Sequence, residues 1–168
     1  MKSVVYPGSF DPITLGHLDI MERSAKVFDK VIVAVLDNVN KDYFFSKKER
    51  IDMVEALTKN YDNIEVCSFD GLLINFMQEI DSNIIIKGLR LVNDFEYENN
   101  MANMNSHLTD GQIETVLMIS NPKYSFISSS SVREILHFGG DITGLVPDVL
   151  VKYINKRFKK NGGGKQSE

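Results

Sequence analysis

A segment near the amino terminus combines glycines, a hydroxyl and an imidazole in a pattern suited to binding phosphate. It reads Gly8-Ser9-Phe10-Asp11-Pro12-Ile13-Thr14-Leu15-Gly16-His17 and follows a short apolar run. A glycine lets the backbone approach a ligand closely, and a helix that begins just before His17 offers unpaired amides and the positive end of its dipole. We therefore expect His17 to donate a hydrogen bond to a phosphoryl oxygen.

Further cations follow two other apolar runs. Lys41 comes after the run 31–36, and Lys87-Gly88-Leu89-Arg90 comes after the run that begins at residue 84. Ligands of open parallel sheets bind beyond the carboxyl ends of the strands, so these cations and His17 should meet at one edge. Such a group suits a reaction on a polyphosphate.

Each of these residues also has a structural interpretation. His17 could serve only as a structural histidine that caps a helix, and Lys41 could be an ordinary solvated lysine in a loop. The serines at 128–131 predict an ordinary helix cap, although a capped helix start with free amides is also an anion site.

The elements that must position these residues alternate along the chain. Short β-branched runs typical of buried parallel strands lie at 3–6, 31–36, 64–69, 84–87 and 114–119. Between them, the amphipathic patterns predict helices around 18–28, 46–57, 72–80, 94–108, 130–138 and 147–158. Because such crossovers are right-handed, we predict an α/β fold with a doubly wound five-stranded parallel sheet.

Composition limits the class of protein. The 168 residues carry a formal charge of -4, which argues against nucleic-acid binding because that needs a broad basic face. No apolar run approaches membrane-spanning length, and the single cysteine excludes an internal disulfide. We expect one domain over 1–158, a disordered polar tail over 159–168 and a cytoplasmic location.

Three segments resemble one known family. Thr14-Leu15-Gly16-His17 resembles the (H/T)xGH signature of nucleotidylyltransferases. Lys87-Gly88-Leu89-Arg90 with Asp94-Phe95-Glu96-Tyr97-Glu98, and Tyr124-Ser125-Phe126-Ile127-Ser128-Ser129-Ser130, are similar to segments of phosphopantetheine adenylyltransferases. The likeness extends from about residue 4 to about residue 153.

The resemblance implies a Rossmann-like nucleotidylyltransferase fold that transfers AMP from ATP to 4′-phosphopantetheine. His17 would stabilise the transition state, and Lys41 and Arg90 would supply further catalytic cations. By the same resemblance, ATP would be bound by Ser9, Phe10, His17, Gly88, Leu89, Arg90, Glu98, Tyr124, Ser125, Phe126, Ile127, Ser128, Ser129 and Ser130. The phosphopantetheine side would be lined by Ser9, Lys41, Leu73 and Lys87.

The resemblance also implies a homohexamer. Mg²⁺ is expected to be held mainly by the phosphates of ATP, since no acidic metal cluster is visible in the sequence. The sequence departs from the common family pattern at Lys87, where arginine is usual, and at Ser9, where many relatives have threonine. Lysine lacks the forked donors of a guanidinium, so phosphate binding at this position should be weaker.

Two alternative functions stay open at this point. One is another nucleotidylyltransferase, for example one that acts on nicotinamide mononucleotide, because the first-strand motif serves that wider group. The other is a non-catalytic ATP-sensing module. The sequence has no GxxxxGK[ST] motif, and no GxGxxG follows the first strand, so the common ATPase and dehydrogenase interpretations lack support.

Overall fold

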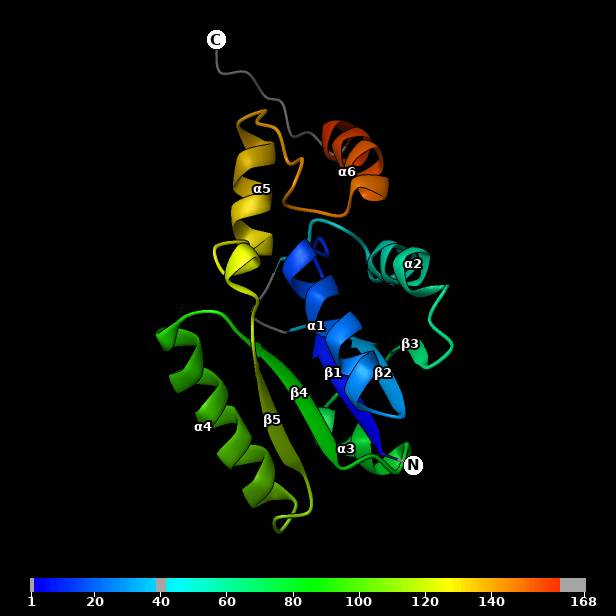
Figure 1. Cartoon of the computed structure of the whole chain (residues 1–168), viewed down its shortest axis with the longest axis vertical. Coiled ribbons are helices and arrows are strands. Elements are labelled where there is room, and N and C mark those ends of the chain that lie inside the picture. The colour runs from blue at the N-terminus through cyan, green and yellow to red at the C-terminus, as the bar shows by residue number, and fades with distance from the viewer. Residues whose placement is uncertain (1, 39–41, 161–168) are drawn as a thin grey trace.

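The computed structural model describes residues 2–38 and 42–160 and contains one parallel sheet of five strands (Figure 1). The strands are β1 (Ser3–Gly8), β2 (Lys30–Val35), β3 (Ile64–Ser68), β4 (Ile84–Leu89) and β5 (Glu114–Ile119). Their order across the sheet is β3-β2-β1-β4-β5. The predicted doubly wound α/β sheet is confirmed, and the chain changes direction across the sheet between β1 and β4, where such folds bind ligands.

The helices lie close to the predicted segments. They are α1 (Leu15–Val27), α2 (Lys47–Thr58), α3 (Leu73–Glu79), α4 (Val92–Leu108), α5 (Ser129–His137) and α6 (Asp148–Lys160). A short 3-10 helix, η1 (Pro122–Tyr124), was not predicted. Helix α6 continues to Lys160, beyond its predicted end at residue 158. The rest of the predicted tail, 161–168, lies outside the described residues.

The two faces of the sheet have separate cores. Val4 and Val33 point to one face and pack in a cluster with residues of α1, α2, α5 and α6. Val5 and Ile32 point to the other face, where they pack with residues of α3. This alternation is the period of two that a strand imposes, and burial on both faces explains why β1 and β2 are continuously apolar. The edge strands β3 and β5 have no buried residue, so the prediction of five buried strands holds only for the centre of the sheet.

Helices α1, α5 and α6 lie near the carboxyl ends of the strands. Figure 1 shows α5 and α6 beyond those ends, while α1 is the first helix after β1. Helix α4 lies along the β4 and β5 side of the sheet and has no buried side chain. Within the described ranges, no helix is both long enough and apolar enough to cross a membrane.

Candidate active site

A cavity of about 290 Å³ opens at the point where the strand order reverses, between the carboxyl ends of β1 and β4. Its walls come from β1 and the turn after it, α1, β4, α4 and the start of α5. Eleven of the predicted site residues line it: Ser9, Phe10, His17, Lys87, Gly88, Arg90, Glu98, Ile127, Ser128, Ser129 and Ser130. The structure thus joins segments that are far apart in the sequence.

The turn after β1 is shaped by the burial of Phe10. This residue has a φ of 49°, a left-handed conformation that is unusual for a bulky side chain. Its ring lies edge-on to Tyr6 at 5.6 Å and to His17 at 5.2 Å between centroids. A Cβ at Gly8 would lie 2.6 Å from a Phe10 ring atom, so glycine is required there to leave room for the ring.

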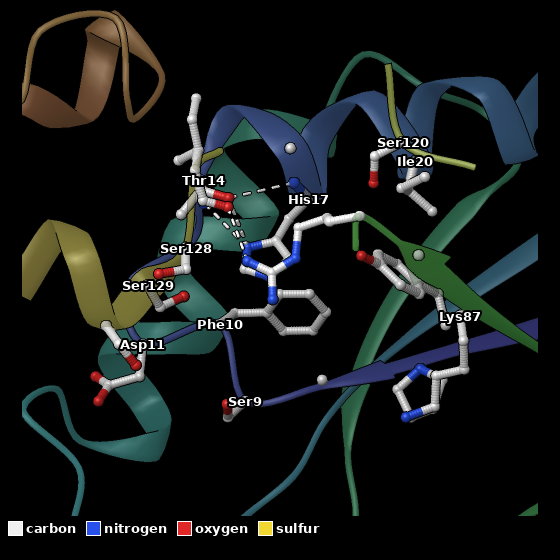
Figure 2. Close-up of a pocket in the computed structure, with 18 of the residues that line it drawn as sticks. Ser9, Phe10, Asp11, Thr14, His17, Ile20, Lys87, Ser120, Ser128 and Ser129 are labelled. Atoms are coloured by element: carbon white, nitrogen blue, oxygen red, sulfur yellow. Dashed lines mark hydrogen bonds between the residues drawn. The ribbon is translucent and has the colours of Figure 1, made fainter. Parts of the chain in front are cut away.

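His17 is oriented by Thr14, the residue that caps α1 (Figure 2). The Thr14 backbone N–H donates to His17 Nδ1 at 3.1 Å, and the His17 backbone N–H donates to the Thr14 hydroxyl at 3.3 Å. The two hydrogen bonds form a capping box in which the histidine replaces the usual Glu or Gln. The imidazole is therefore part of the helix cap, as the structural interpretation of His17 predicted, and it is also a fixed group on the cavity wall.

Asp11 is buried below the turn and holds two neighbouring segments. Its carboxylate accepts hydrogen bonds from the backbone N–H of Phe44 at 2.9 Å and of Phe45 at 2.8 Å. Arg133 of α5 donates to the Asp11 carbonyl oxygen, and its guanidinium lies 3.4 Å from the carboxylate. Asp11 is thus committed to structural contacts and is not available as a base. Sequence reasoning singled out neither Asp11 nor Arg133.

The cationic side of the cavity comes from β4 and the residue after it. Lys87 lies within β4, which extends to Leu89, and its Nζ is 3.4 Å from Glu98 Oε2. Arg90 donates through Nη1 to the Ile127 carbonyl oxygen at 2.9 Å, so it connects the end of β4 to the loop before α5. Asp94 accepts from the backbone N–H of Arg90 and caps α4.

The start of α5 forms the opposite wall. The Ser128 hydroxyl accepts from the Ser131 backbone N–H at 3.0 Å, which confirms the predicted cap. The Ser129 hydroxyl donates to the Pro12 carbonyl oxygen at 2.8 Å and so fixes α5 against the turn after β1. Figure 2 shows Ser128 and Ser129 beside the imidazole and the Phe10 ring. An amino-terminal helix end in this place suits an anion.

Tyr6 adds a neutral hydroxyl to the floor of the cavity. The side chain is buried, and burial raises its pKa well above the ordinary range; the nearby Arg90 opposes this shift and Glu98 adds to it. Tyr6 therefore stays protonated at neutral pH and is a hydrogen-bond donor or acceptor, not a base. Sequence reasoning assigned it only to a strand.

Some predicted site residues lie elsewhere. Leu73 begins α3 and packs with the core on the far face of the sheet, and Leu89 ends β4 with its carbonyl oxygen accepting from Ser120. Tyr124 and Phe126 line a second, more apolar hollow between α1 and α6. The Ser125 hydroxyl donates to the Pro122 carbonyl oxygen. Lys41 lies outside the described residues, so the structure does not place it relative to the cavity.

Comparison with known proteins gives two findings on family. A protein-family model described as Cytidylyltransferase-like matches residues 5–135. Curated proteins named phosphopantetheine adenylyltransferase match almost end to end: one from Clostridium botulinum strain Langeland is 57% identical over 157 residues, which are 94% of this chain and 95% of that protein. The chain belongs to the phosphopantetheine adenylyltransferase family.

Other members of the phosphopantetheine adenylyltransferase family match equally completely. The Clostridium beijerinckii protein is 55% identical over 157 residues, with 94% of this chain and 98% of the relative covered. The Clostridium novyi protein is 53% identical over 160 residues, with 95% and 99% covered. The resemblance of the three sequence segments is therefore confirmed over nearly the whole chain.

A solved structure supports the fold independently of sequence. It comes from Vibrio parahaemolyticus and is provisionally named a nicotinate-nucleotide adenylyltransferase. It superposes with a TM-score of 0.68 over 99% of this chain and 98% of its own, at 17% sequence identity. At this identity the likeness shows the nucleotidylyltransferase fold of the phosphopantetheine adenylyltransferase family and not a shared acceptor.

Proposed function

We propose that this protein transfers AMP from ATP to 4′-phosphopantetheine and so produces dephospho-coenzyme A and pyrophosphate. The observation that supports this most strongly is the convergence of His17, Lys87 and Arg90 with the start of α5 on one cavity. Family membership favours phosphopantetheine as the acceptor over nicotinamide mononucleotide. It also favours catalysis over simple ATP sensing.

The reaction needs alignment more than proton transfer. A phosphate oxygen of the acceptor attacks the α-phosphorus of ATP, a new P–O bond forms, and the bond to the β-phosphate breaks to release pyrophosphate. The attacking monoester has a second pKa of about 6, so it is largely ionised at neutral pH and needs no strong base. Of the carboxylates that line the cavity, Asp11 accepts from two backbone amides, and Glu98 lies in an ion pair with Lys87 at 3.4 Å.

The side chains of the cavity have separable roles in this proposal. His17 donates to the α-phosphoryl group, where charge develops in the transition state. Arg90 and the free amides at the start of α5 bind the β- and γ-phosphates, which leave as pyrophosphate. Lys87 binds the phosphate of the acceptor, and we assign Lys41 to the same end.

Mg²⁺ enters as part of the substrate. Within 2–38 and 42–160, no group of three or more His, Cys, Asp or Glu side chains is arranged to hold a metal ion. Magnesium commonly keeps several waters and binds through substrate phosphates with few protein ligands. We therefore propose MgATP as the nucleotide substrate, with the ion held mainly by its phosphates.

We also propose that the enzyme works in the cytoplasm as a homohexamer. Helix α4 supports an assembly because it exposes an apolar row, Tyr97, Met101, Met104 and Leu108, at helical spacing. Ile119 of β5, 73% exposed, adds to the apolar surface on this side of the sheet. An exposed apolar row of this kind is typical of a subunit interface.

One incubation tests the proposed reaction. Purified protein is mixed with ATP, Mg²⁺ and 4′-phosphopantetheine, and pyrophosphate release is followed together with dephospho-coenzyme A by mass spectrometry. Nicotinamide mononucleotide is the comparison acceptor, and His17→Ala is the control variant. We expect both products with phosphopantetheine and a loss of about 100- to 1000-fold in kcat for His17→Ala, the usual effect of removing a positioned donor.

The outcomes separate the alternatives. Turnover with nicotinamide mononucleotide and none with phosphopantetheine would overturn the proposed acceptor but would support adenylyl transfer as the reaction. Tight ATP binding with no pyrophosphate from either acceptor would overturn catalysis in favour of nucleotide sensing.

A further inference from the structure

Arg50 of α2 is a buried arginine beneath the active-site turn. Its side chain is 1% exposed, and it does not line the cavity. Nη1 donates to the Ser9 carbonyl oxygen at 2.7 Å and to the Leu36 carbonyl oxygen at 3.1 Å. Nε donates to the Phe45 carbonyl oxygen at 3.2 Å. One guanidinium thus joins the turn after β1, the end of β2 and the segment that enters α2.

The charge of Arg50 is balanced by a carboxylate that is shared with a lysine. Nη2 donates to Asp37, whose other oxygen lies 3.0 Å from Lys47 Nζ. Burial alone would raise the pKa of Asp37, but the hydrogen bonds from Lys47 and Arg50 outweigh it and hold this pKa below its ordinary value. Lys47 also binds Asp70, which follows β3. The Arg50 network, defined as Arg50, Asp37, Lys47 and Asp70, therefore reaches three strand ends.

Stability alone is a weak explanation for this arrangement. Removing a cation from water is costly, and well-packed apolar residues of similar volume often stabilise a fold as well as or better than a buried ion pair. Helix α2 already packs Met53 and Val54 into the main core. What an apolar residue lacks is the fork of donors that fixes carbonyl groups from several segments in one geometry.

Arg50 fixes the position of the backbone at Ser9, a residue that lines the cavity. The Ser9 carbonyl group belongs to the peptide that leads into Phe10, the residue with left-handed backbone. On the other side of this turn, Asp11 binds the amides of Phe44 and Phe45. Arg50 and Asp11 therefore hold the same two segments together, and Ser9 lines the cavity.

We propose that Arg50 is a positioning residue for the acceptor end of the active site, acting through Ser9. This inference rests on the proposed function and adds that Ser9, which the family resemblance assigns to both ATP and the acceptor, serves the acceptor end. The ATP-phosphate wall has further contacts of its own: Arg90 donates to the Ile127 carbonyl oxygen, and, among the described residues, α5 meets the turn at Asp11 and Pro12 and not at Ser9. Loss of the fork should therefore affect the acceptor and the chemical step more than ATP affinity.

The test compares Arg50→Lys, which keeps the charge but loses the fork, with a core variant of equal thermal stability. Ile154 of α6 is fully buried and does not line the cavity, so Ile154→Val or Ile154→Ala serves as the matched control. For Arg50→Lys we expect the KM for 4′-phosphopantetheine to rise at least about 5-fold and kcat to fall about 10-fold, since small misplacements cost this much. The KM for ATP should rise less than the KM for the acceptor.

A second measurement does not depend on activity. Hydrogen exchange should become faster in peptides covering 8–12 and 42–46 of Arg50→Lys, and should stay unchanged in 114–119, the strand at the opposite edge of the sheet from β3. Equal changes in both KM values, or kinetics like those of the matched Ile154 variant, would overturn the positioning role. A wild-type protein inactive toward phosphopantetheine would overturn the proposed function instead, and hydrogen exchange would still decide whether Arg50 fixes the turn.

Discussion

The backbone N–H of Thr14 points at Nδ1 of His17, at 3.1 Å. A ring nitrogen that accepts a hydrogen bond from a backbone amide carries no proton, so the network assigns the proton of the neutral imidazole to Nε2. Nε2 is on the side of the ring away from Thr14, and His17 lines the cavity. The helix cap thus selects the tautomer that donates to a phosphoryl oxygen.

Replacing Thr14 should therefore affect catalysis as well as the helix. Thr14→Val keeps the backbone donor but removes the hydroxyl that caps α1 and lies 3.1 Å from Nδ1. We expect a loss of about 1 kcal/mol in stability from the cap, and a fall in kcat of about 10-fold from the looser imidazole. Steady-state pyrophosphate release and thermal unfolding measure the two effects. Thr14→Ser, which keeps the hydroxyl, is the control and should restore most of kcat; a Thr14→Val enzyme with normal kcat would contradict the role.

Much of the framework could be predicted because it depends on local patterns. All five predicted strands are present, and β1 and β2 are buried as their continuous apolar runs indicate, whereas β3 and β5 have no buried residue. Ser46 and Glu49 form a capping box at a spacing that is visible in the sequence. The site residues after β1 and at the end of β4 followed from the rule that ligands bind beyond the carboxyl ends of strands. For these residues, their positions after the predicted strands were enough to predict that they meet at one edge of the sheet.

The supporting contacts could not be predicted because they join segments distant in sequence. Arg50 occurs among other charged residues at the start of α2, a setting typical of a solvated helix face, yet it is buried under Ser9. Arg133 reaches Asp11 across more than a hundred residues of chain. No periodicity marks either residue, since what brings them to the turn after β1 is the packing of α2 and α5 on it.

Lys87 gives a prediction about acceptor affinity. Its Nζ is 3.4 Å from Glu98 Oε2, and that oxygen is buried without a hydrogen-bond partner. An arginine at this position could satisfy the carboxylate with one donor and offer others to a phosphate. We expect Lys87→Arg to lower the KM for 4′-phosphopantetheine about 3- to 10-fold with little change in the KM for ATP.

The control for this prediction is Lys87→Gln, which removes the charge and should raise the KM for the acceptor. Initial rates at varied concentrations of each substrate measure both variants. An unchanged or higher acceptor KM in Lys87→Arg would show that the lysine is not the weaker phosphate ligand.

Glu49 predicts how stability changes in acid. Hydrogen bonds from Arg157 lower its pKa from the ordinary 4.5 to about 2; burial opposes this shift and bonds from Ser46 add to it. Folding therefore favours the ionised form, and this contribution is complete above about pH 4.5 and is lost as the pH falls toward 2. Glu49→Gln should cost about 1 to 2 kcal/mol at neutral pH and progressively less in acid.

Thermal unfolding of the wild type and Glu49→Gln between about pH 7 and about pH 3 tests this. The matched control is Asp52→Asn on the same helix, because Asp52 forms an exposed ion pair with Lys48 and its loss should change stability little at any pH. A difference between wild type and Glu49→Gln that is constant with pH would contradict the assigned ion pair.

Met104 tests whether the exposed row on α4 is a subunit interface. It is 53% exposed and lies between Met101 and Leu108 on one side of the helix. A glutamate there would bury a charge in an apolar contact between copies, which is costly, while leaving the isolated fold nearly unchanged. We expect light scattering to give the mass of six chains for the wild type and a smaller species for Met104→Glu. Asn103→Glu adds the same charge at the neighbouring exposed position and should leave the assembly intact. A Met104→Glu protein that keeps the wild-type mass would place the interface on another surface.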